Sequence, residues 1–267
     1  MMVVDFVDAG VMTFSDSLAV ALGINVGSTA APLISRALPI AKAGLPIIGV
    51  CFFARSATSK PGPSSSGLAF RLLTSCMGLG MLLAGMDLLS AALAPVKSLP
   101  PLRDALLELS GSPVLGVAAG LLLTLLVQSS TAAIAIAAEL AASGAMPLPL
   151  AVAVAVGANV GTCATTLAAG WAGSRSAWRF ALAYTGYKLL AAAAVLPAFG
   201  SFVEASQWAA SLTGPANEAA GVAVACSAAH VLFNAALAAV ALPLVRPAAA
   251  AMDLVVAHDL PAKPKVA

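Results

Sequence analysis

Charged residues are scarce in this chain. Asp, Glu, Lys and Arg make up 9% of the 267 residues, whereas a soluble domain carries about 25%. Hydrophobic residues make up 61%, so the polar residues are too few to cover a folded surface in water. This composition excludes an ordinary soluble domain and predicts an all-α integral membrane protein in contact with the lipid bilayer. The net charge of +2, without a basic run, argues against a nucleic-acid partner.

Cysteine and histidine are sparse as well, and their spacing indicates no metal or redox chemistry. The four cysteines lie singly in apolar stretches, without a CxxC pair or a Cys/His cluster: Cys51, Cys76, Cys163 and Cys226. We interpret them as isolated buried thiols rather than as metal ligands or disulfide partners. No nucleophile–base pair stands out either, so we predict that the chain is not an enzyme and needs no cofactor.

Long apolar stretches dominate what is present. A membrane-spanning helix takes about 20 predominantly apolar residues, and seven stretches approach or exceed that length. They cover residues 11–35, 37–54, 72–96, 113–143, 148–172, 179–199 and 219–245. This pattern predicts a multi-pass protein of the cell membrane.

The distribution of Lys and Arg predicts the orientation, because basic loops tend to stay in the cytoplasm. By this rule the polar loop 55–71 and the tail 246–267 are cytoplasmic, and the acidic residues 200–218 lie outside. We therefore divide the chain into a first repeat, a loop, a second repeat, an outer loop with a final helix, and a tail. Their bounds are 1–54, 55–71, 72–199, 200–245 and 246–267.

An internal repeat is the strongest feature of the sequence. Residues 10–33 align with residues 144–167 at an offset of 134 positions, and eleven of the twenty-four aligned pairs are identical. Both copies contain G-x-N-V-G followed by Ser or Thr, at residues 23–28 and 157–162. The charge rule places the two copies in opposite orientations. That arrangement is an inverted repeat, the architecture of many secondary transporters.

The shared motif is compatible with two structures. Glycine weakens a helix by about 1 kcal/mol relative to Ala, and Asn competes for backbone hydrogen bonds. The motif therefore predicts broken helices whose free carbonyl and Asn/Thr oxygens coordinate a cation at membrane depth. The alternative is close helix packing through small residues. The glycines concerned are Gly23, Gly27, Gly157 and Gly161.

A second polar cluster, Gln128-Ser129-Ser130-Thr131, interrupts the apolar stretch 113–143. Four hydrogen-bonding residues inside hydrocarbon are costly unless they are paired, and each apolar arm is too short to span a membrane. We predict a re-entrant helical hairpin that turns at these residues, with an anion attracted to the start of its second arm. The alternative is one straight helix whose hydroxyls bond back to their own carbonyls.

These motifs, in this order, resemble the type II sodium/phosphate cotransporter family, in which a QSS-type hairpin is followed by GANIGT. The segments 78–93 and 229–234 (AHVLFN) also resemble elements of that family. The resemblance implies sodium-coupled transport of inorganic phosphate. It also implies sodium and phosphate sites at Gln128, Ser129, Ser130, Thr131, Asn159, Thr162, Asn25, Ser28 and Thr29. Within that set, Gln128, Ser129, Asn159 and Thr162 are the expected Na⁺ ligands, with a homodimer as one possible assembly.

The chain also departs from the family pattern. The repeat offset places the first copy's hairpin tip before Met1, so we expect the coding frame to continue upstream. At residues 183–188 (AYTGYK) the counterpart of AHVLFN has Tyr for His and Lys for Asn. The alternative function is therefore a truncated, transport-inactive protein of the same fold that acts as an assembly partner or a relic.

A few further polar residues admit two interpretations. The repeat pairs Glu139 with Asp5, which suits either a cation ligand or gate or a structural hydrogen bond. His230 and Asn234 share one helix face, where we expect an interhelical contact, with contact to the substrate as the alternative. Lys188 lies in mid-span, and we expect it to extend towards the membrane surface.

Overall fold

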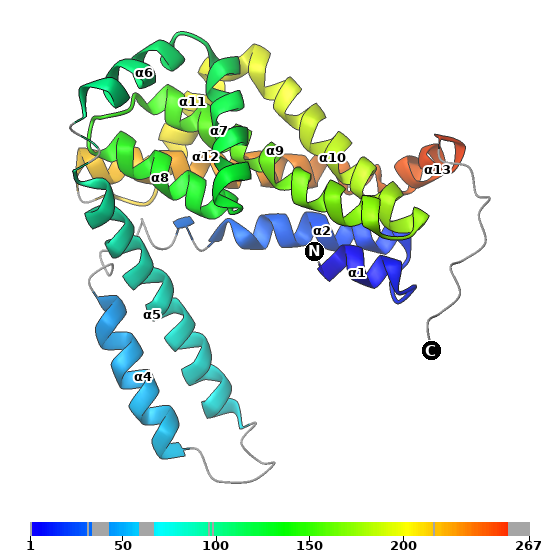
Figure 1. The fold of residues 1–267 in the computed structure, drawn as a ribbon, viewed down its shortest axis with the longest axis horizontal. Helices are drawn as coiled ribbons and strands as arrows, with labels where there is room; N and C mark the ends of the chain where they lie inside the picture. Colours follow the sequence, from blue (N-terminus) through cyan, green and yellow to red (C-terminus); the bar gives the residue numbers. More distant parts are fainter. Residues whose placement is uncertain are drawn as a thin grey trace.

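The computed structural model describes residues 2–30, 32–33, 43–58, 67–95, 97, 99–215 and 217–255. These residues form helices and turns, and no strand occurs among them (Figure 1). The helices are α1 (Met2–Asp8), α2 (Phe14–Ser28), α4 (Gly44–Thr58), α5 (Leu68–Leu93), α6 (Pro100–Ser110), α7 (Pro113–Val127), α8 (Ser130–Ala142), α9 (Leu148–Ala172), α10 (Arg175–Val195), the short η2 (Leu196–Ala198), α11 (Phe199–Ser211), α12 (Glu218–Ala241) and α13 (Val245–Val255).

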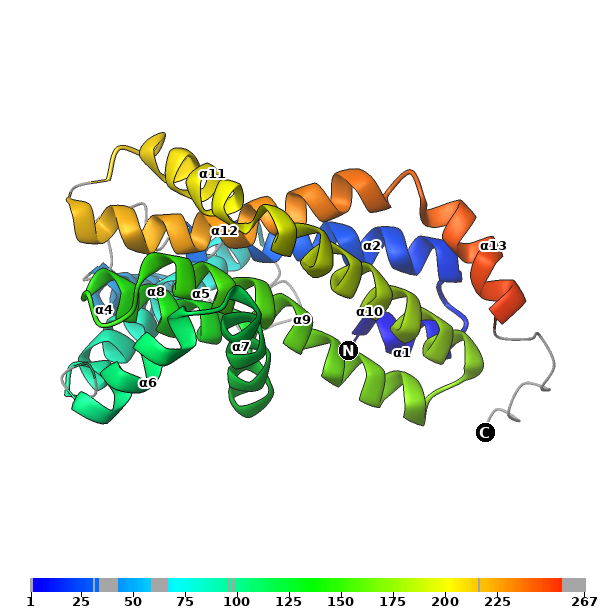
Figure 2. The same ribbon diagram turned by 90° about the horizontal axis from the view of Figure 1, so that it is seen from above.

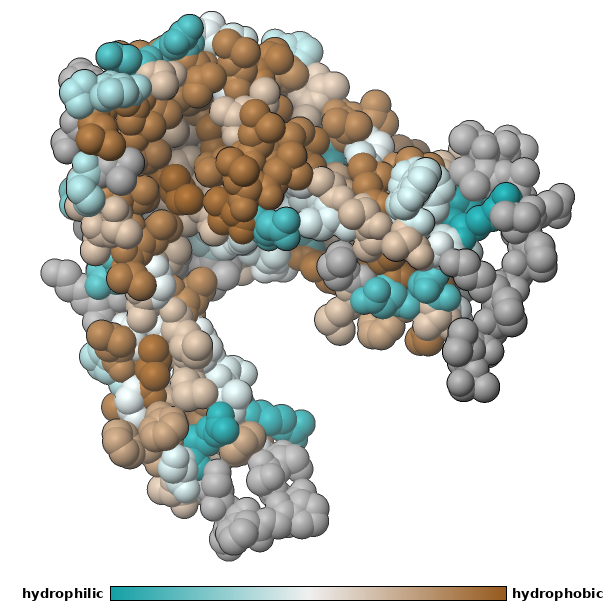
Figure 3. Space-filling view, in the orientation of Figure 1, coloured by the Kyte–Doolittle hydropathy of each residue, from teal (hydrophilic) through white to brown (hydrophobic). Residues whose placement is uncertain are grey.

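The helices divide into a body and a projecting arm. The body contains α1, α2 and α6 to α13, with α9 and α12 at its centre, whereas α4 and α5 pair side by side and extend away from it (Figure 1). Small residues bring the arm helices together: a Cβ on Gly80 would lie 2.9 Å from the carbonyl oxygen of Gly44. The space-filling view shows a largely apolar surface over the arm and the body (Figure 3). Such a surface suits lipid rather than water.

In the part of the chain that the structure describes, four helical segments are long and apolar enough to cross a membrane: α5, α9, the continuous run Arg175–Ser211, and α12. They differ in burial, since 72% of the most apolar window of α9 is buried but only 11% of that of α5. Together with the apolar composition, they identify a multi-pass membrane protein. The bundle core therefore depends on α9, whereas most of α5 is exposed.

Several predicted loops contain helices. Both α4 and α5 extend into the loop 55–71, of which residues 59–66 lie outside the described part. Most of the expected outer loop 200–218 is α11, which continues the line of α10, and α13 occupies the start of the tail. The loops of a membrane protein can contain helices, so the division of the chain into repeats, loops and a tail stays a prediction.

The two sequence copies also share local structure. Gly10 (φ 70°) and Gly144 (φ 74°) both adopt the left-handed conformation that favours glycine. The caps around them match, because Val11 N donates to Phe6 O at 2.9 Å and Ala145 N donates to Leu140 O at 3.0 Å. The following helices, α2 and α9, run in opposite directions in both ribbon views (Figures 1 and 2). This is the relative orientation that an inverted repeat requires.

The broken helices that the G-x-N-V-G motif predicted do not occur. Both α2 and α9 run unbroken through residues 23–28 and 157–162. In α9 the glycines serve close packing instead: a Cβ on Gly157 would collide with the Val117 carbonyl oxygen, and one on Gly161 would lie 2.7 Å from Thr124 Cβ. Packing against α7 outweighs the low helix propensity of glycine, whose cost is only about 1 kcal/mol per residue. Among the described residues, a Cβ added at Gly23 or Gly27 of α2 would meet no atom within 4 Å.

Candidate functional site: a helix break beside a buried polar cluster

The polar cluster at residues 128–131 interrupts the chain as predicted. Helix α7 ends at Val127, and Gln128 adopts the left-handed conformation (φ 58°, ψ 23°) while its N–H donates to Thr124 O at 2.7 Å. Ser129 then caps α8, because its Oγ accepts from Ala132 N at 3.2 Å. A straight helix is therefore wrong. Whether the pair re-enters one side of a membrane stays a prediction.

A positive φ at a non-glycine residue is uncommon and marks a position that the surrounding structure must hold. Gln128 is the one such residue in the described part of the chain. Gln128 is exposed, whereas Ser129, Ser130 and Thr131 are half-buried. The turn therefore presents the Gln128 amide outward at the start of α8, where backbone N–H groups lack helical acceptors.

The start of α8 lies close to the middle of α12. The two helices pack against each other and run antiparallel (Figure 1), and Cys226 Sγ lies 4.0 Å from Ile134 O. Ser130 is one turn before Ile134, and His230 is one turn after Cys226. Because the helices are antiparallel, both residues lie on the same side of that contact, which places the turn next to the polar part of α12.

That part of α12 contributes to a buried cluster of four polar side chains from α9, α10 and α12. Its members are Asn159, Lys188, His230 and Asn234, and each is at most 3% exposed. Asn159 Oδ1 accepts from Lys188 Nζ at 3.2 Å and from Asn234 Nδ2 at 2.8 Å. Lys188 Nζ also donates to Asn234 Oδ1 at 2.9 Å. Asn159 Nδ2 donates to Ala155 O at 2.9 Å, so this Asn bonds to its own helix without breaking it.

Hydrogen bonding defines the tautomer of His230. Its Nδ1 lies 2.9 Å from Asn159 Nδ2 and 3.2 Å from Asn234 Nδ2, both of which are donors. Nδ1 must therefore accept, and the proton of the neutral ring belongs on Nε2. Nε2 is buried and has no hydrogen-bond partner among the described residues. A buried N–H donor without a partner is costly, and it is available to an acceptor that enters the cluster.

The first copy of the motif makes an equivalent but simpler contact. Asn25 Oδ1 accepts from Tyr184 OH at 2.8 Å, as Asn159 pairs with His230. Tyr184 and His230 occupy matching positions in AYTGYK and AHVLFN. Each of these two Asn residues, Asn25 of α2 and Asn159 of α9, thus contacts the second residue of one of the two six-residue motifs.

The predicted hydroxyl ligands bond within their own helices. Thr162 Oγ1 donates to Asn159 O at 2.7 Å, Ser28 Oγ to Asn25 O at 2.9 Å, and Thr29 Oγ1 to Val26 O at 2.7 Å. Each hydroxyl oxygen keeps acceptor capacity. Their role in ion binding stays a prediction.

Lys188 of the cluster, and Tyr184, which contacts Asn25, were not among the predicted site residues. Lys188 does not extend to the membrane surface, since it is 2% exposed and bonds inward. The expected interhelical contact of His230 and Asn234 is confirmed. The available signal was the comparison of AYTGYK with AHVLFN, which marks position 188 as equivalent to an Asn of the cluster.

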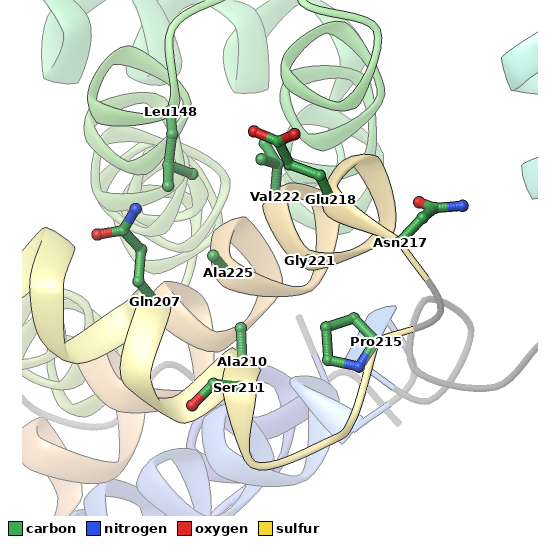
Figure 4. A pocket seen from close by; sticks show the side chains of 10 residues that line it. All are labelled: Leu148, Gln207, Ala210, Ser211, Pro215, Asn217, Glu218, Gly221, Val222 and Ala225. Atoms are coloured by element: carbon green, nitrogen blue, oxygen red, sulfur yellow. The ribbon is translucent and has the colours of Figure 1, made fainter.

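Two cavities lie away from the centre of this cluster. One, of about 360 Å³, opens between α11 and the start of α12 and is lined by Gln207, Asn217 and Glu218 among others (Figure 4). Its one acid disfavours an anionic ligand. The other, of about 340 Å³, is bordered by Asn25, Tyr184 and Thr166. It therefore reaches the polar contact of the first repeat.

Glu139 serves a structural purpose in α8. Its Oε1 accepts from Lys97 Nζ at 2.8 Å and from Ser90 Oγ at 2.6 Å, so it joins the end of α5 to the body. Its repeat counterpart, Asp5, is exposed. The pair does not form a shared cation site.

We expect Glu139→Gln to loosen this junction, because hydrogen bonds to a charged group each contribute about 1.5–3 kcal/mol when partly buried. Hydrogen exchange of residues 84–97 in detergent should become faster by roughly tenfold, equivalent to about 1.4 kcal/mol. Asp87→Asn is the control, since Asp87 is an exposed acid of α5, the helix in which exchange is measured. Equal exchange in the two variants would contradict the role of Glu139.

Comparison with known proteins agrees with these features. The profile of the Na⁺/Pi-cotransporter family matches residues 1–91 and 81–217, and each segment contains one copy of the motif. No solved structure matches the chain.

Two relatives illustrate how similar the chain is to known proteins and how much of their length it covers. "Uncharacterized protein YqeW" of Bacillus subtilis (strain 168) is 30% identical over 196 residues, which cover 73% of this chain and 61% of that protein. The "Putative inorganic phosphate export protein YjbB" of Escherichia coli (strain K12) is 27% identical over 201 residues, 74% of this chain and 35% of that protein. The chain thus spans about three fifths of the first relative and a third of the second. Because the family profile covers most of the chain, this protein belongs to the Na⁺/Pi-cotransporter family.

Proposed function

We propose that this chain moves inorganic phosphate across the cell membrane and that the movement is coupled to Na⁺. The observation that carries the proposal is the helix break at residues 128–131, held next to the buried cluster around Asn159. Polar groups at membrane depth are costly, and they usually mark the path of a substrate or an ion. Family membership supports phosphate as the substrate.

The turn, with the neighbouring helix α9, offers groups that suit a cation and groups that suit an anion. The Gln128 amide oxygen and the hydroxyls of Ser129 and Thr162 suit Na⁺, a hard cation. The first N–H groups of α8, with the Nε2–H of His230, suit an anion. An anion and its coupling ions are driven by the membrane potential at about 2.3 kcal/mol per charge per 100 mV.

One observation favours the second candidate, an assembly partner that does not itself transport. A Cβ added at Gly23 or Gly27 of α2 meets no atom within 4 Å among the described residues, although the equivalent glycines of α9 are covered by α7. A helix from another chain could cover this part of α2. Transport by the purified chain alone would exclude this candidate.

The Gln128 side chain should be needed for transport independently of its backbone conformation. Gln128→Gly relieves the left-handed strain yet removes the amide, whereas Gln128→Ala removes the amide and keeps the strain. We expect both variants to lower Na⁺-driven phosphate transport in proteoliposomes at least tenfold, about 1.4 kcal/mol.

Gln207→Ala, in the cavity beside α11, is the control and should transport at the wild-type rate. Transport that survives in Gln128→Gly would show that the turn geometry, not the amide, matters. Equal wild-type rates with Na⁺ or K⁺ gradients would remove the sodium coupling from the proposal.

A further inference from the structure

Lys188 lies near the middle of α10 and is 2% exposed, the bulkiest of the side chains buried this deeply. Its ammonium group contacts two side-chain oxygens, Asn234 Oδ1 at 2.9 Å and Asn159 Oδ1 at 3.2 Å. The rings of Tyr184 and Phe233 complete the surroundings, each with its centroid 5.8 Å from Nζ. Amide oxygens and aromatic faces are both attractive to a cation.

No acidic side chain forms an ion pair with Lys188 in the described part of the chain. The cluster therefore carries an uncompensated positive charge, held by neutral groups only. An unpaired charge in a membrane interior is costly, and such residues usually serve function. The neutral oxygens around it are those expected of a site for a monovalent cation.

The comparison of the two motifs shows what Lys188 replaces. Lys188 in AYTGYK stands where Asn234 stands in AHVLFN. An Asn at position 188 would leave the amide oxygens of Asn159 and Asn234 without a cation. Its own side chain could add a third amide oxygen to the site. Carbonyl-type oxygens gathered at one point are the usual ligands of hard cations.

We propose that the Lys188 ammonium is a built-in cation that takes the place of one Na⁺ between Asn159 and Asn234. This position then binds no sodium, and its positive charge is present whether or not Na⁺ is available. Naming Na⁺ as the replaced ion rests on the proposed function. Sodium that couples transport would bind elsewhere, and the turn at Gln128 and Ser129 remains available for it.

The test measures thermal unfolding of the full chain in detergent, in NaCl and in KCl at equal ionic strength. Stabilisation by Na⁺ beyond that by K⁺ reports specific binding. We expect Lys188→Asn to gain a sodium-specific rise in Tm on the order of 3 °C. Adding Asn234→Ala to Lys188→Asn should abolish this rise, because it removes an oxygen ligand.

The wild-type protein provides a second measurement that does not depend on folding of the Lys188 variant. The difference in Tm between NaCl and KCl is measured for the wild-type protein. If Asn234→Ala leaves that difference in Tm unchanged, sodium does not bind at this position, as proposed. If Asn234→Ala removes a sodium-specific rise from the wild type, the proposal is overturned. A folded Lys188→Asn without any gain overturns it as well. The assay involves no phosphate movement, so its outcome is separate from that of the transport experiment.

Discussion

Asn159→Ala should destabilise the protein strongly, by about 3 kcal/mol, since a hydrogen bond to a charged group contributes about 1.5–3 kcal/mol and buried groups left without a partner add to the loss. The Asn159 side chain accepts from Lys188 and Asn234 and donates to His230. Truncation leaves Lys188 with one oxygen partner and His230 Nδ1 with one donor. Thermal unfolding in detergent measures the loss, which should appear as a fall in Tm of several degrees.

The internal repeat supplies the control for this experiment. Asn25 is the counterpart of Asn159, but it is half-buried and its oxygen has the single side-chain partner Tyr184. Asn25→Ala should therefore cost about 1 kcal/mol, the net contribution of one hydrogen bond. Similar losses in the two variants would mean that the cluster around Lys188 adds little to stability. Asn159→Ala should also reduce phosphate transport, and the stability measurement shows how much of that reduction is structural.

Gly157→Leu should destabilise the protein as much as Asn159→Ala or more. A single added Cβ at Gly157 already collides with the Val117 carbonyl of α7, so a full side chain must push the two helices apart. Overpacking of a buried contact costs about 1–3 kcal/mol and occasionally more, and here it strikes backbone, which cannot rotate away. We expect at least about 3 kcal/mol of destabilisation, measured by thermal unfolding.

Gly23→Leu is the matched control, because Gly23 is the repeat counterpart and has no neighbour within 4 Å. It should change stability by less than about 0.5 kcal/mol, as exposed substitutions usually do. If Gly23→Leu were as damaging as Gly157→Leu, the α2 face would be covered in the protein, and a partner helix would have to be sought. A tolerated Gly157→Leu would contradict the close contact of α7 and α9.

The polar residues 128–131 and the G-x-N-V-G motif show how much of the structure local sequence signals predict. The break at Gln128 to Thr131 was predictable, because polar residues between short apolar arms and a Ser able to cap α8 act over one turn of chain. The G-x-N-V-G motif misled for the opposite reason. Its glycines suggested local helix breaking, but their use depends on whether another helix packs against them, which residues 157–161 do not reveal.

By itself, the sequence determined that the chain is helical, membrane-embedded, duplicated and interrupted at residues 128–131. Each of these depends on composition or on residues close along the chain. Only the tertiary structure decided that Lys188, Asn159 and Asn234 meet, since their hydrogen bonds join residues 29, 46 and 75 positions apart. Such contacts depend on how α9, α10 and α12 cross. That crossing is set by the packing of many small apolar side chains, and no single motif encodes it.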